Sequence, residues 1–192
     1  MPWGATFQST ITAFLAANNS ASRELTAQTI ASLYHADAQL VSPTLIPGST
    51  PLTLPGPSGI QAGFLASFNA AFAITEGQVG QVPDSIWLPA ASSVVTYWTG
   101  VQFNPLVPAP GGLLGTTSTV TFPGEPSALA SQLGAAFKAG LSATTSAQGA
   151  ALVAAALNGA FVSHLATVSG TWIGTAPGAP PVPYTFPWAG IT

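Results

Sequence analysis

Residues 146–168 read SAQGAALVAAALNGAFVSHLATV, an alanine-rich run that contains no charged residue. From Ala147 to Val168, its length and apolar character make it the best candidate for a membrane span in this chain. However, Gln148, Asn158, Ser163 and His164 interrupt the run, and no lysine or arginine flanks it as an interfacial anchor. We therefore expect a helix buried in protein, not a membrane span. Its small residues would allow close approach to helices of the same subunit or of a neighbour.

The scarcity of charge extends beyond this run. Charged residues make up 4% of the 192 residues, against about 25% in a typical soluble protein. Hydrophobic residues make up an ordinary 47%, and the length fits one domain or two small ones. All the charged residues lie before residue 139: Arg23, Glu24, Asp37, Glu76, Asp84, Glu125 and Lys138.

Such a chain must cover its surface with neutral polar residues, glycine and proline, or with neighbouring subunits. Interface cores are depleted in charge, so we infer that much of this surface is occluded in an assembly. A secreted or cell-surface protein that favours alanine, threonine and proline is the alternative explanation. Five tryptophans, ten phenylalanines and three tyrosines argue against a disordered chain, because aromatic side chains supply the burial that ordering requires.

The composition disfavours several classes of function. The absence of cysteine excludes disulfides and thiolate metal sites. Two basic residues cannot neutralise a nucleic-acid backbone, so no direct nucleic-acid partner is expected. The first seven residues, MPWGATF, lack the basic region and apolar run of a signal peptide.

Amphipathic spacing and proline or glycine boundaries predict alternating helices and connectors. Helices are expected over residues 5–17, 22–40, 58–74, 127–141 and 146–168, with a strand over 116–122. Residues 86–103 carry both strand-forming residues and a helical apolar spacing, and the length of the run favours a helix. The predicted fold class is therefore mainly α with minor β (α+β), in which alanine-rich helices are joined by extended proline- and glycine-rich arms.

The same pattern predicts a mainly helical domain over residues 1–168 and an extended C-terminal arm over residues 169–192. Pro57-Ser58 and Pro126-Ser127 each precede an expected helix with similar alanine and phenylalanine spacing. This weak similarity is compatible with two similar halves, about 1–104 and 116–168, or with chance in an alanine-rich sequence.

The connectors 43–57 and 105–115 and the C-terminal arm are the expected contact elements. Proline fixes the backbone and removes hydrogen-bond donors, and leucines or aromatic residues stand between the prolines. Deletion of residues 176–192 is accordingly expected to leave a folded helical core and to abolish assembly. The predicted interface residues are Leu52, Leu54, Leu113, Leu114, Trp172, Tyr184, Phe186 and Trp188.

Candidate chemistry is sparse. His35 and Asp37 form the one cluster with acid/base potential, but side chains two positions apart on a helix point to different faces. His164 lies in an apolar helix and suits a hydrogen-bonded core or interface role better than metal ligation. No Gly-x-Ser-x-Gly elbow and no lysine-containing phosphate loop occurs in the sequence. We therefore predict no catalytic residue, no metal site and no cofactor.

One stretch of the sequence resembles a known enzyme fold. Residues 29–40, TIASLYHADAQL, resemble the opening of an NTF2-like or ketosteroid-isomerase-like domain, in which a helix ends in a Tyr-His-x-Asp-Ala run. That resemblance implies a long, curved antiparallel sheet after this helix. It also implies a small-molecule enzyme or binding protein, with His35 and Asp37 near the cavity.

A second resemblance covers most of the chain. Alanine-rich helices followed by VSGTWIGT (168–175) and by a proline-rich tail with WAGI (188–191) look similar to virion proteins of tailed phages, from the neck, tail or baseplate. This resemblance implies ring-forming or adaptor behaviour, location in the virion, and partners that are other virion proteins and copies of the same chain. Together with the charge deficit, it predicts a structural subunit that is not an enzyme. The NTF2-like protein and a secreted or cell-surface polymer subunit are the alternatives.

Overall fold

The computed structural model describes residues 3–18, 21–44, 48–74, 81–104, 114–176 and 182–192. The short 3-10 helices η2 (Asp84–Trp87) and η4 (Gly140–Ser142) lie beside the longer helices. The α-helices within the described residues are α1 (Ala5–Ala17), α2 (Arg23–Ala38), α3 (Ser58–Phe72), α4 (Leu88–Trp98), α5 (Pro126–Ala139) and α6 (Ser146–Thr167). The strands are β1 (Gln102–Phe103), β2 (Leu114–Phe122), β3 (Ser169–Ala176) and β4 (Val182–Ala189).

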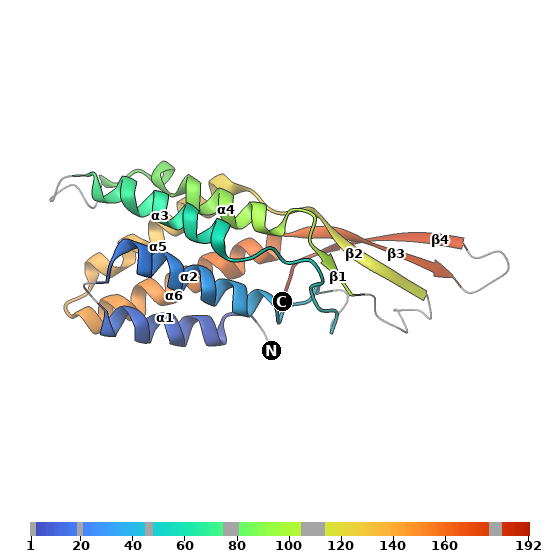
Figure 1. The fold of residues 1–192 in the computed structure, drawn as a ribbon, viewed down its shortest axis with the longest axis horizontal. Helices are drawn as coiled ribbons and strands as arrows, with labels where there is room; N and C mark the ends of the chain where they lie inside the picture. The colour runs from blue at the N-terminus through green and yellow to red at the C-terminus, as the bar shows by residue number, and fades with distance from the viewer. Residues whose placement is uncertain (1–2, 19–20, 45–47, 75–80, 105–113, 177–181) are drawn as a thin grey trace.

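The helices form three antiparallel hairpins, α1–α2, α3–α4 and α5–α6 (Figure 1). Each helix packs on its neighbours in sequence, and α6 packs back on α1, so that the hairpins close into a ring. Each hairpin returns the chain to the same end of the bundle, where Pro43, β1 and β3 begin the extended segments. The repeated unit is therefore a helical hairpin followed by extended chain, and the first of the two predicted halves contains two such units.

The helix ends explain where each hairpin begins. Ser22 caps α2, because its Oγ accepts a hydrogen bond from the backbone N–H of Leu25 at 3.2 Å. Thr145 caps α6 in the same way through the N–H of Gln148, also at 3.2 Å. Helix α1 has no such cap of its own, since Gly4 stands at that position with a φ of 94°. The backbone N–H of Phe7 in its first turn instead donates to a residue of α2, described below.

The interior of this closed set of helices is filled by aromatic side chains. Phe161 of α6 contacts Trp3, Phe7, Tyr34 and Phe64, with ring centroids 4.8–6.5 Å apart. Edge-to-face geometry dominates these contacts, as aromatic pairs prefer. One buried cluster extends through this interior to the residues beneath the sheet, from Trp3 to Ile191.

The strands form an antiparallel sheet in the order β1-β2-β3-β4, which extends from one end of the bundle (Figure 1). Large rings on this sheet lie over glycines. A Cβ atom on Gly170 would come within 2.3 Å of the Trp188 ring, and one on Gly174 would come equally close to Trp172. The indole of Trp188 also donates a hydrogen bond to Ser118 Oγ at 2.6 Å. Glycine at these two positions therefore lets both tryptophans lie flat against the sheet and become buried.

Strand β4 lies at the outer edge of the sheet and contains Pro183 and Pro187. Proline has no backbone N–H, so within sheets it is found on edge strands, where it donates to no neighbour. The opposite edge is β1, which has two residues and forms an additional bridge between Phe103 and Pro51.

The predicted fold class, mainly α with minor β, is confirmed. The ambiguous run 86–103 contains helix α4, as its length favoured, and then the short strand β1. The C-terminal segment differs from the extended arm that was predicted. It forms the hairpin β3–β4, and β3 pairs with β2, so that the tail belongs to the same sheet as earlier residues. Local composition indicated an extended backbone, but the strand pairing depends on residues about 50 positions earlier, as in Thr119 opposite Thr171.

The architecture also departs from the one that the NTF2-like resemblance implies. After α2 the chain enters a connector and then α3, where that family requires a long, curved antiparallel sheet. Within the described residues, the sheet is small and lies at the end of the helical bundle, so the Tyr-His-x-Asp-Ala run is a local likeness only.

Candidate functional site

His35 and Asp37 point to different partners, as their spacing on the helix predicted. His35 Nδ1 lies 2.6 Å from the hydroxyl of Tyr97, and its Nε2 lies 2.9 Å from the amide nitrogen of Gln39. Asp37 is buried, and its Oδ2 accepts a hydrogen bond from the backbone N–H of Phe7 at 3.1 Å. The carboxylate thus caps the first turn of α1 and complements the positive end of that helix. The two residues do not form a joint acid/base site.

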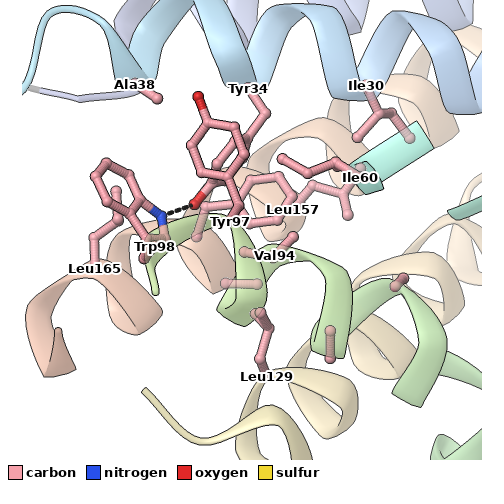
Figure 2. Packing of buried hydrophobic residues seen from close by; sticks show 14 of the residues in the cluster. Ile30, Tyr34, Ala38, Ile60, Val94, Tyr97, Trp98, Leu129, Leu157 and Leu165 are labelled. Carbon is pink, nitrogen blue, oxygen red and sulfur yellow. Dashed lines mark hydrogen bonds between the residues drawn. The ribbon is translucent and has the colours of Figure 1, made fainter. Parts of the chain in front are cut away.

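The tyrosines near His35 are also structural. The buried hydroxyl of Tyr34 accepts a hydrogen bond from the indole N–H of Trp98 at 2.6 Å (Figure 2). Burial raises the pKa of Tyr34 well above its ordinary value, and the bond from Trp98 offsets this only in part. Burial likewise raises the pKa of Tyr97 above its ordinary value. Both phenols stay protonated at neutral pH, and neither is poised as a base.

His164 lies under the turn that leads from β2 into α5. Its side chain is 4% exposed, and Nε2 donates to the carbonyl oxygen of Pro123 across 2.9 Å. The other nitrogen, Nδ1, is buried without a hydrogen-bond partner. Burial lowers the pKa of His164 to about 4, and the bond to Pro123 opposes that shift only weakly. His164 is therefore a neutral core histidine at pH 7, as one of its two predicted roles required. Within the described residues, no group of three potential metal ligands comes together.

The predicted interface residues whose side chains are described fall into three groups. Trp172 and Trp188 are 4% and 3% exposed and belong to the chain's own core. Phe186 and Leu54 are partly buried and pack against that core. Leu52 is exposed. Leu113 lies outside the described residues, and for Leu114 and Tyr184 the description is limited to the backbone of β2 and β4.

The burial of Trp188 changes one expectation. Removal of residues 176–192 would take β4, Trp188 and Ile191 away from the buried cluster, and with them the partner strand of β3. The predicted truncation would consequently damage the fold itself and could not report on assembly alone.

An apolar hollow of about 700 Å³ lies at the end of the bundle remote from the sheet. Trp87 and Phe137 stack on its wall with ring centroids 4.2 Å apart. Lys138 lies in the lining and is 3.2 Å from Asp84 Oδ1. Hydrogen bonds from Ser131 and from Lys138 lower the pKa of Asp84. The remaining described lining consists of Phe68, Ala71, Phe72, Ala73, Ile74, Val82, Gly134 and Leu141.

The outward face of α6 carries no charged residue and exposes large apolar side chains. Leu152 and Val162 are 36% and 45% exposed, and the exposed positions between them are Ala155 and Gly159. The helix was expected to be buried, yet only 39% of its most apolar 18-residue stretch is buried inside the protein. Among the described helices it is the one that is long and apolar enough to cross a membrane by length and composition.

Comparisons with protein-family models, with curated proteins and with solved structures give no match to this chain.

Sequence reasoning placed the contact elements in the connectors 43–57 and 105–115 and in the C-terminal arm, and it noted the small residues of the helix at 146–168 without assigning them an outward face. The missed signal is the spacing of Leu152, Ala155, Gly159 and Val162, which are three or four positions apart and share one side of the helix. Because α6 is apolar on all sides, its pattern alone does not reveal which side faces the core.

Proposed function

We propose that this chain is a structural subunit of a large protein assembly, of the kind found in the neck, tail or baseplate of a phage virion. The observation that carries the proposal is the outward face of α6, which is apolar and lies in a stretch of 54 residues, 139–192, without a charged side chain. A soluble protein that functions alone normally places charged residues on such a face, because charge resists association.

The interior supports a structural role over a catalytic one. The ring of helices is filled by side chains, and His35, Asp37 and His164 each have a structural contact that accounts for them. Apart from the Asp84–Lys138 pair and the buried Asp37, the charges in the described residues are Arg23, Glu24 and Glu125. Arg23 itself lies over the Phe72 ring, 5.1 Å from its centroid. Subunit contacts would therefore depend on shape and apolar burial.

The proposal is tested by finding where the native protein resides in its source. Particles purified by density gradient should contain the chain in many copies, as measured by quantitative mass spectrometry. Recovery of the protein as a free species in the cell lysate or in the medium would contradict the proposal. Recovery from the medium or the cell surface without particles would favour the polymer-subunit alternative.

Binding of a small apolar molecule is a second candidate function, favoured by the hollow beside Trp87. Its volume of about 700 Å³ lies in the range of small-molecule sites, and its lining is mostly apolar. An aromatic ligand in this hollow would stack near Trp87 and Phe137 and change indole fluorescence. Titration of the Trp87→Phe variant with the same aromatic compounds supplies the control, because the signal should then be lost.

A further inference from the structure

Five of the exposed residues of α6 follow the spacing of a helix–helix seam. Leu152, Ala155, Gly159, Val162 and Ala166 are all exposed and are separated by three, four, three and four positions. This alternation keeps one face toward a partner helix along its whole length, as in coiled coils. Within the chain, α6 is flanked by α1 and α5, which contact its sides and leave this face open.

Gly159, at the centre of the seam, has no explanation within the chain. Glycine in a helix is less favourable than alanine by about 1 kcal/mol. At Gly63 a side chain is excluded, because a Cβ atom would lie 2.6 Å from the carbonyl oxygen of Pro89. At Gly159, apart from the adjacent residues and the backbone of the same helix turn, no atom of the described residues lies within 4 Å of the Cβ position. Close approach by a second helix from outside would account for the missing side chain.

Hollows beside the seam supply space for a partner's side chains. One of about 240 Å³ is lined by Gly159, Ala135 and Ala156, and the next, of about 220 Å³, is lined by His164 and Phe122. Both are lined by Gln132 and Ser163, so they form one groove between α5 and α6. Side chains the size of Leu152 and Val162 could enter this groove from another copy of the chain.

The position of Glu125 favours an antiparallel over a parallel arrangement of α6 helices from two copies of the chain. Among the described residues that line the groove, Glu125 alone is charged, and it lies at the same end as Thr167. Two copies that meet antiparallel at Gly159 would hold their Glu125 residues about 24 Å apart along the helices, since each residue contributes about 1.5 Å. That separation exceeds the screening length of about 8 Å at physiological salt. A parallel pair would bring the two carboxylates together.

We propose that two copies of this chain form a two-fold dimer in which their α6 helices pack antiparallel and cross at Gly159. The same residues then serve both subunits, as a two-fold interface requires. The exposed sides of α6 and α5, with 22 and 14 residues, give a face of roughly 500 Å² in projection for helices about 10 Å wide. A stable interface buries roughly 800 Å² per partner, so the contact must include the groove between α5 and α6 as well as the seam itself.

This pairing deepens the proposed assembly role, because it identifies one contact of the subunit, but it is tested on the purified full-length chain. Sedimentation velocity over a range of concentrations should give a dimer for the native sequence. Val162→Glu should weaken the dimer at least about tenfold, because a carboxylate would be desolvated in the seam. The matched control is Ala36→Glu, which adds the same charge to an exposed position of α2 and should leave the dimer unchanged.

Cysteine cross-linking gives a second readout, in a chain that has no natural cysteine. Gly159→Cys should form a disulfide between two copies under mild oxidation, because the crossing brings the two positions together, whereas Ala36→Cys should not. Leu152→Cys alone should fail to cross-link, since an antiparallel pair places it opposite Ala166. A monomer at all concentrations, or cross-linking of Leu152→Cys but not of Gly159→Cys, would overturn the proposal.

The outcomes separate this inference from the proposed function. A monomeric chain that is nevertheless abundant in purified particles would end the dimer proposal and leave the assembly role standing. A dimer that never occurs in particles would support the dimer proposal and contradict the assembly role. Binding of a monomeric chain to lipid vesicles, prevented by Val162→Glu, would assign the face of α6 to a membrane and likewise overturn the dimer.

Discussion

Phe161 and Val162 are adjacent in sequence and occupy opposite environments. Phe161 is fully buried and meets four aromatic rings from other segments, whereas Val162 points outward and is exposed by nearly half. Both are apolar residues of the same uncharged helix. The difference shows that in α6 hydrophobicity serves two purposes: one side closes the ring of helices, and the other is left uncovered by the chain itself.

The largest expected effect separates these two neighbours. Phe161→Ala should lower the free energy of unfolding by about 3–5 kcal/mol, because it removes a ring from a packed interior and leaves a cavity. Val162→Ala should change the free energy of unfolding by less than about 0.5 kcal/mol. Urea unfolding, at protein concentrations low enough to keep the chain monomeric, measures the free energy of unfolding of both variants. Similar losses for the two variants would mean that the outward side of α6 is covered after all.

The free energy of unfolding should fall at acid pH because of His164, which lies on the buried side of α6. Its folded-state pKa of about 4 lies below the ordinary histidine value of about 6.5, so folding favours the neutral form. The resulting contribution is fully present above pH 6.5 and is lost as the pH falls toward 4. The loss should approach roughly 3 kcal/mol. His164→Gln should flatten this dependence between pH 7 and 5, whereas His35→Gln should retain it. An unchanged acid profile in His164→Gln would contradict the assignment.

A smaller effect is expected where α1 meets α2. Asp37→Ala removes the acceptor for the N–H of Phe7 and should cost about 1–2 kcal/mol, in the range of a lost helix cap. Asp37→Asn keeps an oxygen at the same place and should cost less. Hydrogen exchange of the Phe7 amide should accelerate in the alanine variant. Equal protection in all three proteins would show that Asp37 does not hold the start of α1.

Two helical glycines give the smallest and most discriminating comparison. Gly159→Ala should raise the free energy of unfolding of the monomer by up to about 1 kcal/mol, since alanine favours the helix and the space beside it is open. Gly63→Ala should lower it, because its Cβ atom would press on the carbonyl oxygen of Pro89. Thermal unfolding of the two variants provides the measurement. A destabilised Gly159→Ala monomer would remove the main reason for placing a partner there.

The helices could be predicted from the sequence because their signals are local. The amphipathic spacing of residues 5–17, Pro57 before α3 and Pro126 at the start of α5 indicated helices at the positions where the structure has them. The separation of His35 from Asp37 also follows from helical spacing alone. The mainly α fold class could therefore be predicted from interactions between residues that lie only a few positions apart in the sequence.

The candidate site could not be predicted in the same way. Trp188 looked like a free aromatic anchor, but Gly170, which makes room for its ring, lies 18 positions earlier and on another strand. Likewise, the outward direction of Leu152 follows from α1 and α5 packing on the sides of α6. Both depend on contacts between distant segments, which composition and periodicity do not encode.

The prolines of β4 have a further consequence for a chain with so few charges. Sheet proteins commonly guard their edges against aggregation with lysine, but this chain has no lysine or arginine after Lys138. Pro183 and Pro187 remove two of the backbone donors that an incoming strand of another molecule would need. The edge of the sheet at β4 therefore resists amyloid-like stacking, and replacing both prolines with threonine should allow the purified chain to form fibres.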